Sequence, residues 1–129
     1  MQVLTSGETG ANSLTDINNN FNIAATRIVT TVTQSATPAI NTDVTDIASI
    51  TGLAQAITSF TTNLTGTPVA GQLLMIQITD NATPRAITWG VKFASTLTTL
   101  PTTTVTSTML RIALQWNTVN STWDCIGVS

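Results

Sequence analysis

Apolar and polar residues alternate with a period of two through most of the chain after residue 28, and this feature limits the fold more than any other. The stretches QLLMIQITD (72–80), AITWGVKF (86–93) and MLRIALQWN (109–117) show the alternation most clearly. Because successive side chains of a β-strand point to opposite faces, such stretches predict strands with one buried and one exposed face. We therefore expect an all-β fold.

The composition supports strands as well. Threonine makes up about a fifth of the chain, several times its usual share, and its branched side chain suits a pleated, half-buried surface. Only 8% of the residues are charged, so the polar surface must consist mainly of hydroxyl and amide groups. With 42% apolar residues in 129, the chain is expected to fold as one domain around a modest core.

About eight short strands are predicted, with turn signals roughly a dozen residues apart. The expected strands cover 27–35, 40–50 (as one strand or two), 58–64, 72–80, 86–93, 109–117 and 123–129. We expect 72–80 and 86–93 to form a hairpin around NATPR, and the last two strands to form another. This spacing is typical of an antiparallel β-sandwich, a jelly roll or a small barrel. The segment 52–57 is expected to be a turn or a short helical piece, and 96–108 a threonine-rich crossing segment.

Residues 1–28 form a separate unit in this interpretation, and residues 29–129 form the β-domain. A glycine-rich lead precedes a short helix whose apolar residues are three or four positions apart, namely Leu14, Ile17, Phe21, Ala24 and Ile28. This stripe covers only about two heptads, so the helix would be marginal alone. Two arrangements stay open: an oligomeric stem in which copies pack together, and a helix packed on its own domain.

Two of the three tryptophans are predicted to lie in the core. Trp89 shares its strand face with apolar neighbours, and so does Trp116; the two sets of neighbours are Ile87, Val91 and Phe93, and Leu110, Ile112 and Leu114.

Trp123 differs, because Ile126 and Val128 fall on the opposite strand face from it. If those two point inward, Trp123 is exposed. It would then be a ligand platform, an anchor at a subunit interface, or a side chain folded over the sheet.

Several functions are disfavoured by what the chain contains. It has no histidine, which removes the commonest general base and zinc ligand, and we expect neither catalysis nor a metal or other cofactor. The carboxylates Asp43 and Asp46 are interpreted as turn or cap residues. Four cations are too few to bind a nucleic-acid backbone or an acidic membrane; they are Arg27, Arg85, Lys92 and Arg111.

The N-terminus has neither a basic nor an apolar segment of the signal-peptide type, and no stretch is apolar enough to span a membrane. The single cysteine, Cys125, has no cation beside it in sequence and is expected to be an inert core residue.

A resemblance adds to this picture. The segments ATPAINTDVTDIASITGLAQAITSFTTNLTGTP, ITDNATPRAITWGVKF, LPTTTV and NSTWDCIGVS resemble a domain of bacteriophage structural proteins, with RAITWG followed by LPTTTV as the most specific part. The resemblance covers residues 35–129. Separately, GETGANSLTDINNNF resembles the start of phage fibre proteins.

The resemblance implies a non-enzymatic, homotrimeric virion component that is made in the host cytoplasm and carries its β-domain outward. Its partners would be copies of itself and the major capsid, neck or tail proteins. Because long fibres place such a domain at the end of a large chain, the short chain favours a head fibre, a capsid-decoration subunit or a short tail-fibre component. The alternative is a module that binds a carbohydrate or receptor on the host surface.

Overall fold

The computed structural model describes residues 27–129, which fold into eight β-strands with no helix in that range. The all-β prediction is confirmed for this part of the chain. The strands are β1 (Val29–Thr31), β2 (Ile40–Asn41), β3 (Ile47–Leu53), β4 (Leu64–Thr65), β5 (Leu73–Asp80), β6 (Phe93–Ser95), β7 (Leu110–Asn117) and β8 (Thr122–Val128). The positions of β5 and β7 agree closely with two of the three clearest alternating stretches, 72–80 and 109–117.

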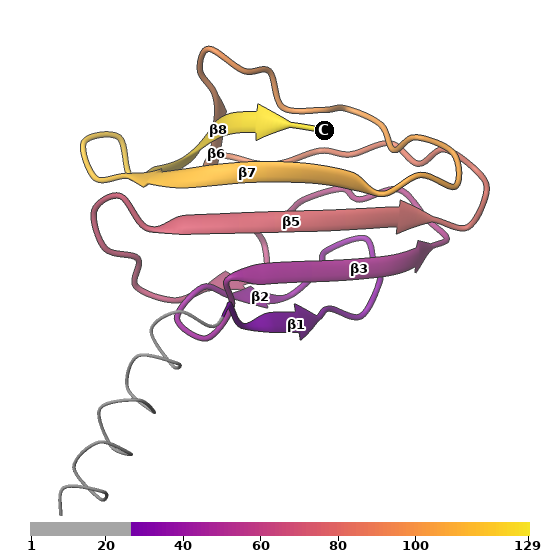
Figure 1. Cartoon of the computed structure of the whole chain (residues 1–129), viewed down its shortest axis with the longest axis horizontal. Helices are drawn as coiled ribbons and strands as arrows, with labels where there is room; N and C mark the ends of the chain where they lie inside the picture. Colours follow the sequence, from indigo (N-terminus) through magenta and orange to yellow (C-terminus); the bar gives the residue numbers. More distant parts are fainter. Residues whose placement is uncertain (1–26) are drawn as a thin grey trace, which may run out of the picture.

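Six strands form one sheet in the order β1-β3-β5-β7-β8-β6 (Figure 1). The pairs β1–β3, β3–β5 and β6–β8 are parallel, whereas β5–β7 and β7–β8 are antiparallel. The prediction of a purely antiparallel sandwich is therefore wrong. Three of the five pairings join strands that run in the same direction, and parallel strands need a crossover connection rather than a tight turn.

The first five strands wind through two layers, which explains the parallel pairs β1–β3 and β3–β5. β2 and β4 pair in parallel as a second, two-stranded sheet, and the chain visits it between β1 and β3 and again between β3 and β5. Val29 pairs with Ile47 and Ile47 with Met75, so the two turns of this winding take 18 and 28 residues. The arrangement is solenoid-like, with unequal turns, rather than a jelly roll.

The expected hairpin of 72–80 with 86–93 does not form. β5 lies between β3 and β7, and residues 86–93 make isolated bridges at Ala86 and Ile87 before β6 begins. The backbone turns at Gly90, where φ is +90°, so the alternation breaks there. As a result Val91, predicted to be a core residue, is 83% exposed, while Trp89 and Phe93 are buried as predicted.

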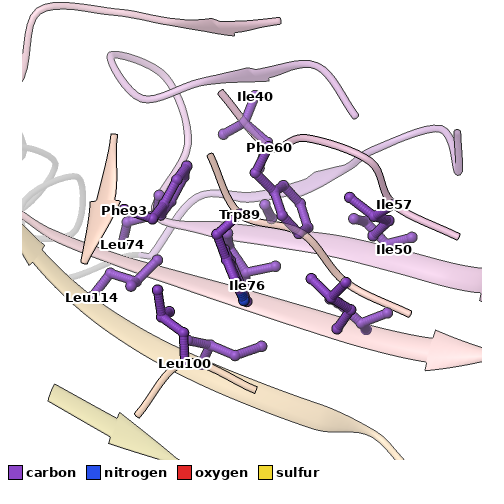
Figure 2. Close-up of a cluster of buried hydrophobic side chains, with 14 of the residues drawn as sticks. Ile40, Ile50, Ile57, Phe60, Leu74, Ile76, Trp89, Phe93, Leu100 and Leu114 are labelled. Atoms are coloured by element: carbon purple, nitrogen blue, oxygen red, sulfur yellow. The ribbon is translucent and has the colours of Figure 1, made fainter. Parts of the chain in front are cut away.

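The core lies between the inner face of the six-stranded sheet and the loops and short strands that cover it. Leu74, Ile76 and Ile78 of β5 are all buried, in agreement with the sequence analysis, and so are their counterparts in β7, Leu110, Ile112 and Leu114. Figure 2 shows Trp89 at the centre of this cluster. Its ring stacks on Phe60 at 4.6 Å between centroids and lies 5.3 Å from the ring of Phe93.

Candidate functional site

Four of the five predicted stem residues, Leu14, Ile17, Phe21 and Ala24, lie outside the described residues. Ile28 lies inside them and is 51% exposed. Its amide donates to the Asp46 carboxylate at 2.7 Å, and its carbonyl accepts from the amides of Asp46 and Ile47. Ile28, immediately before β1, is thus already hydrogen-bonded to the start of β3 and the residue before it.

Trp123 is not an exposed aromatic. Only 1% of its surface is accessible, and Cys125, two residues later, is fully buried. In contrast, Ile126 is 51% and Val128 40% exposed. The prediction that Trp123 points outward is wrong for the described part of the chain.

A β-bulge explains the error. The hairpin of β7 and β8 forms as predicted, but its register shifts between Ala113 and Leu114, so that Leu114 pairs with Cys125 and Ala113 with Gly127. Ile126 is the extra residue. An inserted residue exchanges the two faces of a strand. Trp123 and Cys125 therefore face the core although Val128 pairs with the core residue Ile112.

The partly exposed tryptophan is Trp116, at the end of β7. It packs on the edge of the core while remaining partly open, and its ring lies 5.4 Å from that of Trp123 at a tilt of 60°. Its strand face was predicted correctly. Trp116 is the next-to-last residue of β7 and lies directly before the turn TVNST. This position at the end of a strand was the signal that could have indicated exposure.

Trp116 lies in a groove of about 350 Å³, which we call the Trp116 groove. It is formed where the β7–β8 turn meets β4 and the loop that follows β4. Its lining residues are Thr42, Thr61, Leu64, Thr65, Gly66, Thr67, Pro68, Lys92, Trp116, Ser121 and Trp123. The lining is thus an aromatic surface surrounded by hydroxyl groups and one cation.

The walls of the groove are held by hydrogen bonds. The Asp43 carboxylate accepts the amide of Thr67 at 2.8 Å and so fixes the loop after β4. On the other side, the Lys92 carbonyl accepts the amide of Trp123 at 2.7 Å, and the Lys92 amide donates to the Thr61 hydroxyl. The Lys92 backbone is therefore anchored to β8 beside the tryptophans.

A second surface feature crosses the outer face of the six-stranded sheet. Val29, Ile47, Met75, Ala113 and Gly127 are register partners on five consecutive strands and form what we call the apolar row. With strands about 4.8 Å apart, the row is about 19 Å long. A neighbouring row of partners is polar: Thr31, Ser49, Gln77 and Arg111.

The apolar row is exposed enough to contact another molecule. Val29 is 60% exposed, and the adjacent Leu73 and Ile126 are 43% and 51% exposed. A groove of about 310 Å³ runs over the middle of the row, and Arg27, the first described residue, lines it together with Asp46. Arg27 therefore lies at this face of the domain.

The carboxylates of the described part serve the backbone or neighbouring side chains. The buried Asp80 accepts the Thr104 hydroxyl at 2.7 Å and the amides of Ser107 and Ala82. The Ser107 amide, followed by the Thr104 hydroxyl, lowers the pKa of Asp80 below its usual 3.8. Asp124 accepts from Asn117 and Thr122.

Asp43 and Asp46 likewise accept backbone amides, and within residues 27–129 no three acidic or cysteine side chains gather as a metal site would require. Cys125 is buried, and burial raises the pKa of its thiol. This environment fits the inert role expected for it.

The two most specific segments of the resemblance, RAITWG (85–90) and LPTTTV (100–105), are in direct contact. Ala86 bridges Thr103, and the amide of Ile87 donates to the carbonyl of Thr102 at 2.9 Å. Comparison with protein-family models, curated proteins and solved structures finds no match to the chain.

Among residues 27–129, no helix is long and apolar enough to cross a membrane.

Proposed function

We propose that this chain is a non-enzymatic structural protein of a bacteriophage virion: a short homotrimeric head fibre, a capsid-decoration subunit or a tail-fibre component displayed on the particle exterior. It is made in the host cytoplasm and needs no cofactor. Its partners are copies of itself and the capsid, neck or tail proteins to which it attaches.

The observation that carries the proposal is the apolar row beside Arg27. Apolar side chains that are exposed side by side on one face can mark a protein–protein contact. In a closed ring of identical subunits, every copy presents the same patch to the axis. A stem built from Leu14, Ile17, Phe21 and Ala24 would hold the three chains together at Arg27, next to the row.

The contact between the two resemblance segments also supports the proposal. RAITWG and LPTTTV are separated in sequence, yet Trp89 of the first donates its indole N–H to the Pro101 carbonyl of the second. The two segments thus form one packed unit of the domain. The resemblance at both segments is therefore a resemblance in one structural feature rather than in two unrelated ones.

The oligomer is tested by the mass of the full-length chain in light scattering after gel filtration. We expect three times the chain mass of 13.5 kDa for the wild type. Val29→Asp and Phe21→Asp should each lower this mass, the first through the sheet face and the second through the stem. Val119→Asp is the matched control, because Val119 is 90% exposed in the β7–β8 turn, away from the row.

A monomeric wild type would overturn the homotrimer. A mass that changes with Val29→Asp but not with Phe21→Asp would refute the stem while leaving the sheet face as the interface. The place in the virion is tested separately, by electron microscopy of purified particles labelled with an antibody against the chain. Particles that carry no label at head, neck or tail would refute the virion assignment.

A second candidate function is a module that binds a carbohydrate or receptor on the host surface. The Trp116 groove favours it, because ligand sites combine a concave aromatic surface with a few polar groups. The two functions are compatible in one fibre subunit, since the groove and the apolar row share no lining residue.

A further inference from the structure

We propose that the Trp116 groove binds an acidic sugar, that is, a saccharide unit whose ring carries a carboxylate. This inference rests on the second candidate function and not on the homotrimer. It names the site, which is not the Trp123 surface expected from the sequence, and the class of ligand.

The first argument is the aromatic floor. One face of a pyranose ring presents C–H bonds, which pack against the electron-rich face of an indole. Trp116 is partly exposed in the groove, whereas Trp123 is buried behind it at 5.4 Å. This packing fixes the Trp116 ring before a ligand arrives, so that little side-chain freedom is lost on binding.

The second argument is the supply of hydroxyl groups. Thr67 and Ser121 both line the groove, and their hydroxyls form no hydrogen bond to another residue of the 27–129 range. Each can both donate and accept, as sugar hydroxyls do. Thr61, in contrast, already donates to the Trp89 carbonyl and accepts from the Lys92 amide, so it serves the wall of the groove.

The third argument is charge, and it selects the ligand class. Lys92 is the one charged residue among the lining residues, none of which is acidic. Its side chain is exposed, and its backbone is anchored to β8 through the Trp123 amide. A neutral sugar would leave this ammonium group unused. A carboxylate beside the ring would accept a charge-assisted hydrogen bond from it.

The size of the groove suits this ligand. At about 350 Å³ it is near the lower end of the range for small-molecule sites, which is enough for one sugar ring and part of its neighbour.

The test uses the full-length chain and two probes that differ in one charge per residue: a trimer of galacturonic acid and the methyl ester of the same trimer. Binding is followed by nuclear magnetic resonance through the indole N–H signal of Trp116, assigned by its loss in Trp116→Phe. We expect the acid trimer to bind about tenfold more tightly than its ester, as one charge-assisted contact would provide.

The variants separate the contributions. Lys92→Gln should remove the preference for the acid and leave ester binding unchanged, while Trp116→Ala should abolish binding of both probes. Arg111→Gln is the matched control, because it removes a cation from the outer sheet face and should change neither affinity. Folding of each variant is checked by its remaining indole signals.

Each contrary outcome overturns the proposal. Absence of any shift with both probes would refute the groove as a sugar site, and equal binding of acid and ester would refute the selection by charge. An equal effect of Arg111→Gln and Lys92→Gln would indicate attraction by overall charge alone. None of these results depends on the mass of the assembly, so the homotrimer can stand or fall independently.

Discussion

The indole N–H of Trp89 donates a hydrogen bond of 2.7 Å to the carbonyl oxygen of Pro101. This bond joins the buried aromatic cluster to the threonine-rich segment 96–108, which connects β6 to β7. It also satisfies the single polar atom of a side chain that is otherwise surrounded by Phe60 and Phe93. Trp89 therefore acts both as a core residue and as a clamp on the crossing segment.

Replacing Trp89 separates these two roles. Trp89→Phe keeps most of the apolar contact but removes the donor to Pro101, and we expect it to lower the free energy of unfolding by about 1–2 kcal/mol. Trp89→Ala also leaves a cavity and should cost about 3–5 kcal/mol. Urea unfolding monitored by circular dichroism measures both values. A Trp89→Phe variant as stable as the wild type would contradict a separate contribution from the hydrogen bond, and equal losses for the two variants would contradict a contribution from packing.

Asp80 should make the stability depend on pH. Its pKa is lower in the folded chain than the usual 3.8, so its contribution is fully present above pH 3.8 and is lost as the pH falls through the folded value. Asp80→Asn removes this contribution. We expect the wild type to be more stable than the variant at pH 7, and the difference to shrink as the pH falls below 3.8.

Urea midpoints of the wild type and Asp80→Asn across this pH range provide the measurement. Asp43→Asn is a useful comparison, since Asp43 accepts an amide in an exposed loop rather than in a buried cluster. A difference between the wild type and Asp80→Asn that stays constant from pH 7 to pH 2 would show that the carboxylate's charge has no part in stability.

Gly90 is required by both conformation and space. Its φ is +90°, and a Cβ placed there would lie 2.8 Å from the Cβ of Thr61. Gly90→Ala should cost about 2–4 kcal/mol, as backbone strain and crowding add. Gly52 is the control: its φ is +62°, but a Cβ would meet nothing within 4 Å. Gly52→Ala should cost about 1–2 kcal/mol, and a larger loss than at Gly90 in thermal unfolding would contradict this explanation.

The Cys125 thiol should be unreactive in the native chain. It is fully buried, and burial raises its pKa, so little thiolate is present and no reagent reaches it. We expect Ellman's reagent to label it only after unfolding, at a rate that follows the unfolding rate as urea is added. Rapid labelling without urea would place the middle of β8 outside the stable core.

Local strand positions could be predicted from the sequence, but strand partners could not. The alternation in β5 and β7 correctly located their buried faces because it depends on one strand alone. The parallel neighbours of β5 and β3 are set by two crossover turns of 18 and 28 residues, and turns of unequal length leave no repeat in the sequence. The prediction of neighbouring antiparallel hairpins therefore held for β7–β8 and failed for 72–93.

The candidate site shows the same limit. Ile126 adds one residue to β8. Because of this bulge, Trp123 lies on the opposite strand face from the one inferred from the sequence. The exposure of Trp116 depends on the loop after β4, which is distant in sequence and held by Asp43. Neither the bulge nor the contact with the loop after β4 can be recognised from the sequence of β7 or β8 alone. Lys92, in turn, lines the same groove as both tryptophans, and its carbonyl is bonded to the Trp123 amide of β8.

The place of β6 at the edge of the six-stranded sheet has a consequence for synthesis on the ribosome. Within that sheet β6 pairs with β8 alone, and Phe93 meets its partner Trp123, which is added 30 residues later. During this interval the backbone groups of β6 have no strand to bond. A nascent chain stalled between these residues would present a free strand to other chains, so slow codons in this interval should promote co-translational aggregation.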